Sequence, residues 1–269
     1  MKHLFFSFIM FTAFRLFAEV PEVPAHIDHT PLDRLLQRYV DDKGLVDYKT
    51  WKNNQEDVAA LKSYVSQFAP VPETPARDDD LNASLINAYN AFTIAFILDN
   101  FPVQSIRLLD APFDGKRYTI GGQQVSVDMI EHDMLRPLIG WKVHALVVCA
   151  ARSCPPLHNR AYTAENWEKL MRERYRVWLA RSDLNTYDPD HGWRNNGRVE
   201  LSKIFDWYSE DFTGEHSVEK VLVQFGPADY HEFLNKGGYS IRYKSYDWGL
   251  NDQGTTGDDY QHNPLRSIF

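Results

Sequence analysis

Three residues in the middle of the chain have side chains suited to nucleophilic catalysis: Glu131, His144 and Cys154. A thiol attacks well only as the thiolate, which a neighbouring imidazole stabilises. A carboxylate can in turn fix the tautomer of that imidazole. These residue types predict a triad in which Cys154 is the nucleophile, His144 the general base and then acid, and Glu131 the orienting carboxylate.

The segment around the two cysteines suggests how the thiols are presented. Residues 143–151 are continuous, rich in Val and flanked by turns, which is typical of a buried strand. Alternation along this strand would point Cys149 into the core. Pro155 and Pro156 fix the turn after Cys154. We therefore expect a free, accessible Cys154 on a rigid elbow and a buried Cys149.

Glu131 falls inside the apolar stripe of a predicted helix that runs from Ser126 to about Arg136 and ends at Pro137. A buried carboxylate needs a partner, because desolvation penalises its charge. Two interpretations remain open. Glu131 belongs to the catalytic site, or it forms a structural salt bridge with an arginine such as Arg117 or Arg152.

Residues 81–98 predict the central buried helix, since apolar side chains occupy nearly its whole circumference. The acidic residues 78–80 suit its N-terminus. Asn87 and Asn90 interrupt the apolar pattern on one face. A buried amide must be hydrogen-bonded, so these two are either structural or line the site, where one could donate to an oxyanion.

The remaining elements are short and mixed, which favours an α+β fold. We expect a single domain over residues 31–251, with a mixed or antiparallel sheet packed on the central buried helix, and a polar tail over 252–269. Helices are predicted over residues 32–40, 54–68, 163–180 and 217–225, and a further helix after Pro227 that ends at Leu234. A hairpin is predicted over residues 117–125, strands over 45–48, 199–201 and 239–243, and a loop over 183–197.

The first residues read as a targeting segment. Lys2 and His3 precede an apolar run over residues 4–13, and Ala18 is a small residue suited to cleavage. We predict a signal peptide over residues 1–18, an extended leader over 19–30, and a periplasmic or secreted protein. An uncleaved anchor or a buried helix is the alternative. No second stretch looks long enough to span a bilayer, so we expect no membrane association after cleavage.

Composition argues against several partners. The formal net charge is -8 and no long basic run is present, so a nucleic-acid partner is not expected. His132, His158 and His191 lack metal-ligand spacing, the fragment 188–190 is too short for a calcium loop, and no glycine-rich phosphate loop follows a strand. We expect neither metal nor cofactor. Lys203 is expected to line the site.

Six blocks of sequence, kept in order, closely resemble the family catalogued as domain of unknown function 547. The blocks are residues 87–91, 127–131 with 135–137, 144–150, 153–157, 201–208 and 246–251. The resemblance spans about residues 30–251. Gly249 departs from the pattern, in which a Ser is expected. The resemblance places the family's Glu, His and Cys on Glu131, His144 and Cys154, and implies a papain-like, possibly permuted, thiol-hydrolase arrangement.

Three functions are consistent with these residues. The first is an exported thiol-dependent hydrolase or acyl transferase that acts on an amide, thioester or isopeptide bond of a small peptide-like substrate. The second is a non-enzymatic periplasmic module that binds a protein partner and whose polar cluster is structural. The third is a thiol redox protein that uses Cys149 and Cys154. The position of the His144 ring relative to Cys154 Sγ separates the first from the others.

Overall fold

The structure is a computed structural model that describes residues 20–192 and 196–254. The predicted signal peptide and most of the predicted tail lie outside the described residues. The α-helices are α1 (Thr30–Tyr39), α2 (Tyr48–Asn53), α3 (Gln55–Ser66), α4 (Asp78–Asn100), α5 (Val127–Met129), α6 (Arg136–Ile139), α7 (Trp167–Ala180), α8 (Ile204–Trp207), α9 (Val218–Phe225) and α10 (His231–Lys236). The strands are β1 (Tyr118–Ile120), β2 (Gln123–Val125), β3 (Thr186–Asp188), β4 (Arg198–Leu201) and β5 (Ser240–Tyr243). A π-helical segment covers Ile130–Leu135, and 3₁₀ helices cover Ile106–Leu108, Gly140–Ala145, Ser209–Asp211, Gly214–His216 and Ala228–Tyr230.

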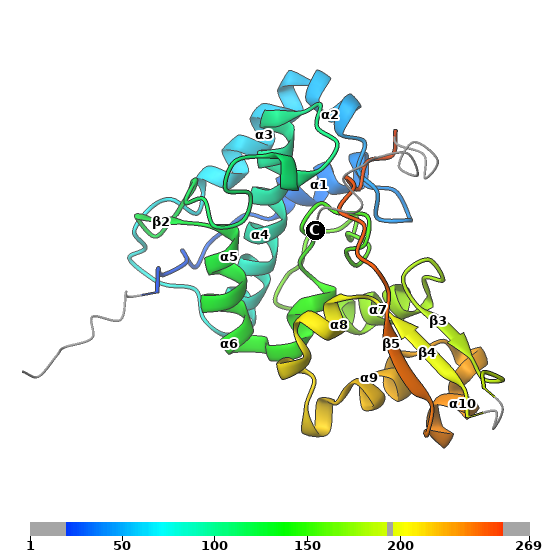
Figure 1. Ribbon diagram of the computed structural model, residues 1–269. Helices are drawn as coiled ribbons and strands as arrows, with labels where there is room; N and C mark the ends of the chain where they lie inside the picture. Colours follow the sequence, from blue (N-terminus) through cyan, green and yellow to red (C-terminus); the bar gives the residue numbers. More distant parts are fainter. Residues whose placement is uncertain (1–19, 193–195, 255–269) are drawn as a thin grey trace, which may run out of the picture.

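Helix α4 is the central buried helix that the sequence predicts, and it packs against helices on several sides (Figure 1). Its partners include α2, α3, α5 and α7. Its nearly uniform apolar surface explains this position, because a helix without a polar face must be covered all round. The acidic residues Asp78, Asp79 and Asp80 form its first turn.

By length and composition, α4 could also cross a membrane. This corrects the expectation that no stretch beyond the N-terminal one is long enough. Within the fold, 83% of the helix's most apolar window is buried, which is the environment of a core helix.

The sheets are small, and the helix and strand content confirms the mixed α and β character. The hairpin β1–β2 forms as predicted, with Gly121 and Gly122 at positive φ in its turn. A second sheet has the order β3–β4–β5, with β4 antiparallel to β3 and parallel to β5. It lies at the end of the molecule near α9 and α10 (Figure 1). The β3–β4–β5 sheet lies apart from α4, but the hairpin contacts this helix, because the Tyr118 ring stacks on Phe92 at 4.3 Å. The prediction of a sheet packed on the central helix therefore holds only for the hairpin.

The predicted strand over residues 143–151 is also wrong. The chain forms the 3₁₀ helix Gly140–Ala145, and Leu146 and Val147 then both donate to Val143 O. The apolar run was a sound indicator of burial. It could not indicate a strand, because periodicity alone does not separate a buried strand from a buried turn of helix. The predicted strand over residues 45–48 does not form either, because only Val46 pairs there, in isolated bridges.

The helix that carries Glu131 does not end at Pro137. It continues through the π-helical segment Ile130–Leu135 into α6, where Pro137 stands in the first turn. Arg136 N donates to Glu131 O, five residues back. In the first turn of a helix the missing N–H of a proline costs little, and π-helical turns are frequent at functional sites.

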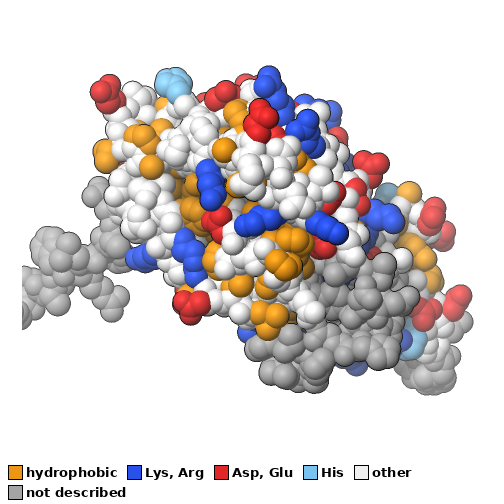
Figure 2. Space-filling view, turned by 90° about the horizontal axis from the view of Figure 1, so that it is seen from above, with side chains coloured by type: hydrophobic (Ala, Val, Ile, Leu, Met, Phe, Trp, Pro, Cys, Tyr) orange, Lys and Arg blue, Asp and Glu red, His pale blue; other side chains and the backbone are white. Residues whose placement is uncertain are grey.

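Side chains and a distant segment anchor the loop that carries both cysteines. Asn90 on α4 donates to Leu146 O and accepts from Val148 N at 2.9 Å each. Arg152 N donates to Gly249 O and Asn251 N to Ala150 O. Basic and acidic side chains are interspersed with small apolar clusters on the face shown in Figure 2, whereas this loop is largely buried.

The replacement Asn90→Ala should destabilise the protein by about 2–4 kcal/mol, because it leaves a buried N–H and a buried C=O without partners. Urea unfolding measures the difference. Asn100→Ala is the matched control on the same helix, because the exposed Asn100 amide donates only to Phe96 O. Equal stability losses in the two variants would contradict an anchoring role for Asn90.

Candidate functional site

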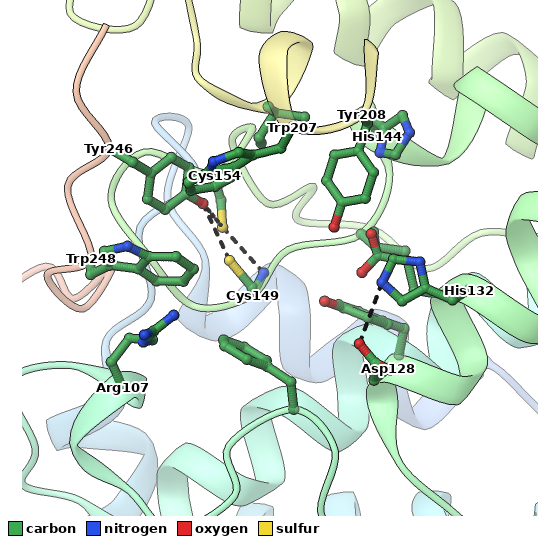
Figure 3. A pocket seen from close by; sticks show the side chains of 15 residues that line it. Arg107, Asp128, His132, His144, Cys149, Cys154, Trp207, Tyr208, Tyr246 and Trp248 are labelled. Carbon is green, nitrogen blue, oxygen red and sulfur yellow. Dashed lines mark hydrogen bonds and ion pairs between the residues drawn. The ribbon is translucent and has the colours of Figure 1, made fainter. Parts of the chain in front are cut away.

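A pocket of about 400 Å³ collects most of the residues with chemical potential (Figure 3). It is bounded by the α5 and π-helical segment, the loop with both cysteines, α8, and the chain near Tyr246. The residues that line it are Tyr89, Arg107, Phe113, Asp128, Glu131, His132, His144, Val147, Cys149, Cys154, Ile204, Trp207, Tyr208, Tyr246 and Trp248. All three predicted catalytic residues are among them.

Cys154 Sγ is surrounded by hydrogen-bond donors. The Cys149 amide donates to it at 3.2 Å, and the Tyr246 hydroxyl lies at 3.1 Å. Burial would raise the pKa of the Cys154 thiol, but hydrogen bonds from Cys149 and Tyr246 lower that pKa below its ordinary value. A thiolate at this position is thus favoured by donors rather than by an imidazole.

The two thiols differ from the expected pattern of exposure. Cys154 is only 4% exposed, and Cys149 is partly exposed. The prediction of an accessible Cys154 and a buried Cys149 is therefore wrong. The strand alternation on which it depended is absent. The hydrogen bond to Cys154 and then burial raise the pKa of Cys149 well above its ordinary value. Both thiols are free, and the Tyr246 hydroxyl reaches both, at 3.3 Å from Cys149 Sγ (Figure 3).

His144 is paired with a residue that sequence reasoning missed. Its Nε2 lies 2.7 Å from Asp211 Oδ2, and its ring packs against Tyr208 at 4.2 Å between centroids. No hydrogen bond joins His144 to Cys154 or Glu131, all of which the structure describes. An ionised Asp211 requires the proton on Nε2, so a neutral ring has its lone pair on Nδ1.

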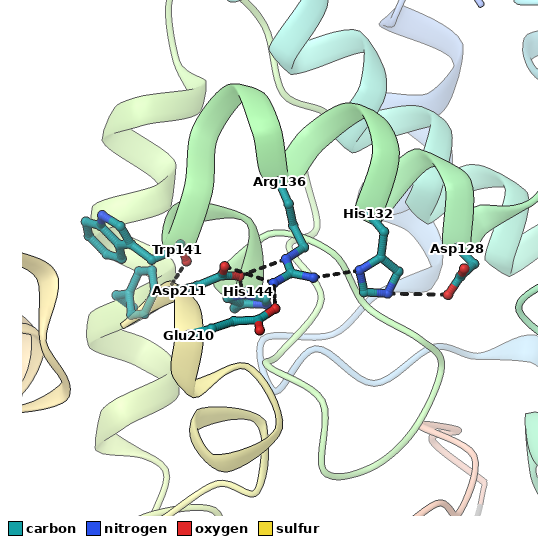
Figure 4. A network of polar contacts seen from close by, with 8 residues as sticks. Asp128, His132, Arg136, Trp141, His144, Glu210 and Asp211 are labelled. Carbon is teal, nitrogen blue, oxygen red and sulfur yellow. Dashed lines mark hydrogen bonds and ion pairs between the residues drawn. The ribbon is translucent and has the colours of Figure 1, made fainter. Parts of the chain in front are cut away.

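Asp211 is itself fixed by a bidentate contact with Arg136 (Figure 4). Arg136 Nε is 2.8 Å from Oδ2 and Nη2 is 2.9 Å from Oδ1. The hydrogen bond from His144, together with those from Arg136, holds the pKa of Asp211 far below its usual range. Arg136 also contacts His132, which pairs with Asp128. A chain of polar contacts therefore runs from the pocket rim to His144.

Glu131 is 7% exposed and lines the pocket. It interacts with Tyr208, and it forms no ion pair with any residue that the structure describes. The alternative of a structural bridge to Arg117 is not realised, because the Arg117 guanidinium donates to the carbonyls of Asp110 and Ala111. Burial, then the Glu131 carboxylate, raises the pKa of Tyr208.

The other predicted site residues lie outside the pocket lining. Asn87 holds the backbone of Tyr162, accepting from its N–H and donating to its C=O. Asn90 holds residues 146–148 in the same way, so both amides are structural hydrogen-bonders. Lys203 pairs with Asp206 at 2.5 Å and does not line the pocket.

The sequence held a signal for two of the site residues that were not predicted. Tyr208 and Tyr246 stand in two of the blocks that carry the family resemblance, whereas Asp211 lies beyond the nearer block. Over residues 20–192 and 196–254, no group of three or more His, Cys, Asp or Glu side chains is arranged to hold a metal ion.

The fold and the site define a mixed α and β protein with a thiol-containing aromatic pocket. Residues 75–179 match the model of the family described as protein of unknown function, DUF547. This match confirms the family resemblance, and it includes Glu131, His144, Cys149 and Cys154. No curated protein and no solved structure matches the chain significantly.

The replacement Asp211→Asn should cost about 1–3 kcal/mol at pH 7, because it removes charge-assisted hydrogen bonds to His144 and Arg136. A lowered pKa in the folded state stabilises the protein above the ordinary carboxyl pKa, and that contribution is lost as the pH falls. The deficit in urea unfolding should therefore shrink below about pH 4.

The exposed Lys142–Glu168 pair gives the control. Glu168→Gln should change the free energy of unfolding by less than about 0.5 kcal/mol at either pH. A deficit for Asp211→Asn that stays constant from pH 7 to pH 3 would contradict a charge-dependent role for this carboxylate.

Proposed function

We propose that this protein is a thiol-dependent hydrolase or acyl transferase in which Cys154 is the nucleophile. The observation that carries the proposal is the set of donors around Cys154 Sγ in a pocket. Once the sulfur is a thiolate, the Tyr246 hydroxyl can only donate to it. Two donors then stabilise the negative charge, which is how a buried cysteine is made reactive at neutral pH.

The reaction would proceed in two balanced steps. The Cys154 thiolate attacks a carbonyl carbon, the bond to the amine or thiol leaving group breaks, and a thioester forms. His144 Nδ1 first takes the proton that leaves the Cys154 thiol, passes it to the leaving group, and then takes a proton from the attacking water or amine and returns it to the Cys154 sulfur when the thioester breaks. Asp211 takes the orienting role first assigned to Glu131, because it holds Nε2. Hydrolysis or aminolysis of the thioester returns the free thiol.

This mechanism requires His144 to approach Cys154 when substrate binds, since no hydrogen bond joins them in the structure. Catalytic hydrogen bonds often tighten only in the substrate complex. The papain-like, permuted arrangement and the export of the protein belong to this proposal, as does a small peptide-like substrate. A pocket of about 400 Å³ is within the size range of small-molecule sites.

A thiol redox function is the second candidate, and one contact favours it. The Tyr246 hydroxyl reaches both sulfur atoms, at 3.1 and 3.3 Å, so both thiols gather around one group. One thiol has a lowered pKa and the other a raised one, as a thiol–disulfide exchange pair needs. In that function Cys154 would attack a substrate disulfide and Cys149 would resolve the mixed disulfide.

Acylation by p-nitrophenyl acetate distinguishes the two functions. The intact protein should gain one acetyl group on Cys154, detected by peptide mass spectrometry, and should release p-nitrophenol catalytically. Cys154→Ser should lose both signals. Cys149→Ser should retain them, because the backbone amide of residue 149 still donates to Cys154 and the serine hydroxyl can replace the thiol as a side-chain donor. Loss of turnover in both variants, with reduction of a disulfide substrate only by the unaltered protein, would favour redox chemistry instead.

The replacement Tyr246→Phe should raise the pKa of Cys154, because it removes a donor to the thiolate. A hydrogen bond to a charged group contributes roughly 1.5–3 kcal/mol, so the pH midpoint of alkylation by iodoacetamide should rise by about 1–2 units. Cys149→Ser as background keeps one thiol to follow. Tyr243→Phe, remote from the pocket lining, should leave the midpoint unchanged. An unchanged midpoint in Tyr246→Phe would remove this tyrosine from the mechanism.

A further inference from the structure

The pocket beside Cys154 has two unlike walls. One wall is aromatic, with Tyr246 and Trp248 at 4.6 Å between ring centroids and Trp207 at 4.7 Å from Tyr246. The other wall comes from the α5 and π-helical segment, which presents Asp128 and Glu131. Figure 3 shows Trp248 and Tyr246 on the side away from Asp128 and His132. Aromatic faces opposite carboxylates are suited to an organic cation.

Glu131 is the buried carboxylate on this wall and has no ion-pair partner among the described residues. Asp128 contacts His132 Nε2 at 3.3 Å and is half exposed, so water can solvate it, whereas Asp211 is paired with Arg136. Glu131 interacts with Tyr208, and no Lys, Arg or His among residues 20–192 and 196–254 forms an ion pair with this carboxylate. A buried carboxylate of this kind is costly unless a positive charge joins it.

The neighbouring aromatic wall already accepts a positive charge. The Arg107 guanidinium lies 4.9 Å from the centroid of Trp248, so a ring of this wall stabilises a positive charge in the folded protein. Glu131 is also close enough to the thiols to add to the upward shift in the pKa of Cys149, after the hydrogen bond to Cys154 and burial. A group bound at Glu131 would thus lie in the same pocket as the reacting sulfur.

We propose that the pocket binds a cationic group of a peptide-like substrate, an ammonium or guanidinium, with its charge at Glu131 and its apolar stem along the aromatic wall of Tyr246, Trp248 and Trp207. This inference rests on the proposed function for the bond that Cys154 attacks. The binding itself depends on the carboxylate and the rings, not on the thiol.

The test uses the full chain carrying Cys154→Ser, so that no chemistry follows binding. N-acetyl-lysine amide and N-acetyl-arginine amide are titrated against the tryptophan fluorescence, with N-acetyl-norleucine amide as the uncharged counterpart. At least one cationic ligand should bind about tenfold more tightly than norleucine amide. Adding Glu131→Gln should remove this preference. Adding Glu168→Gln, a carboxylate outside the pocket, should leave it unchanged.

The ligand comparison decides the matter even if Glu131→Gln fails to fold. Equal affinity for the charged and uncharged ligands, or no saturable binding of either cation, overturns the proposal. A preference that survives Glu131→Gln in a folded protein overturns it as well. Because Cys154 is absent throughout, failure of the acylation experiment leaves this result standing, and failure here leaves the acylation result standing.

Discussion

Backbone groups of a buried loop must be hydrogen-bonded, and the loop from Leu146 to Cys154 has no sheet to satisfy them. Asn90 supplies a donor and an acceptor from the central helix. The segment near Gly249 supplies further partners, through Arg152 N and Ala150 O. These contacts join three parts of the chain far apart in sequence. They place both thiols beside Tyr246 on the strand-like C-terminal segment, so the site exists only when the whole domain is folded.

A second constraint orients His144 independently of Cys154, to which it makes no hydrogen bond. Asp211 is held by two bonds to Arg136, and its ionised state is stabilised strongly. The imidazole therefore has a fixed tautomer before any substrate enters. Cys154 is stabilised separately, by Tyr246 and the Cys149 amide. The site thus consists of two separate groups, His144 with Asp211 and Cys154 with its hydrogen-bond donors, rather than a preformed triad. Tyr208 connects these parts of the site, since its ring packs against His144 and it interacts with Glu131.

Local patterns in the sequence predicted the elements that depend on local forces. The central helix followed from its uniform apolar surface, the hairpin from Gly121-Gly122, and the helix over Val218–Phe225 from its Ser217 cap. The run over residues 143–151 misled because its buried backbone is hydrogen-bonded by Asn90 and by the segment near Gly249 rather than by neighbouring strands. Asp211 could not be predicted, since its contact with His144 spans 67 positions and no spacing rule connects them.

The carboxylates of Glu131 and Asp211 have different surroundings and therefore different roles. The sequence placed Glu131 in a buried stripe, which the structure confirms. It also required a charged or donating partner, and no described residue forms an ion pair with this carboxylate. The partner was assigned as His144 because a triad needs a third group. In the structure, the carboxylate with two cationic or proton-donating neighbours is Asp211, whose charge is thereby neutralised locally. Glu131 faces the pocket and forms no ion pair with any residue that the structure describes. A carboxylate that positions a base has its hydrogen bonds supplied by the protein itself. A buried carboxylate without an ion pair can instead attract a cation that enters the cavity.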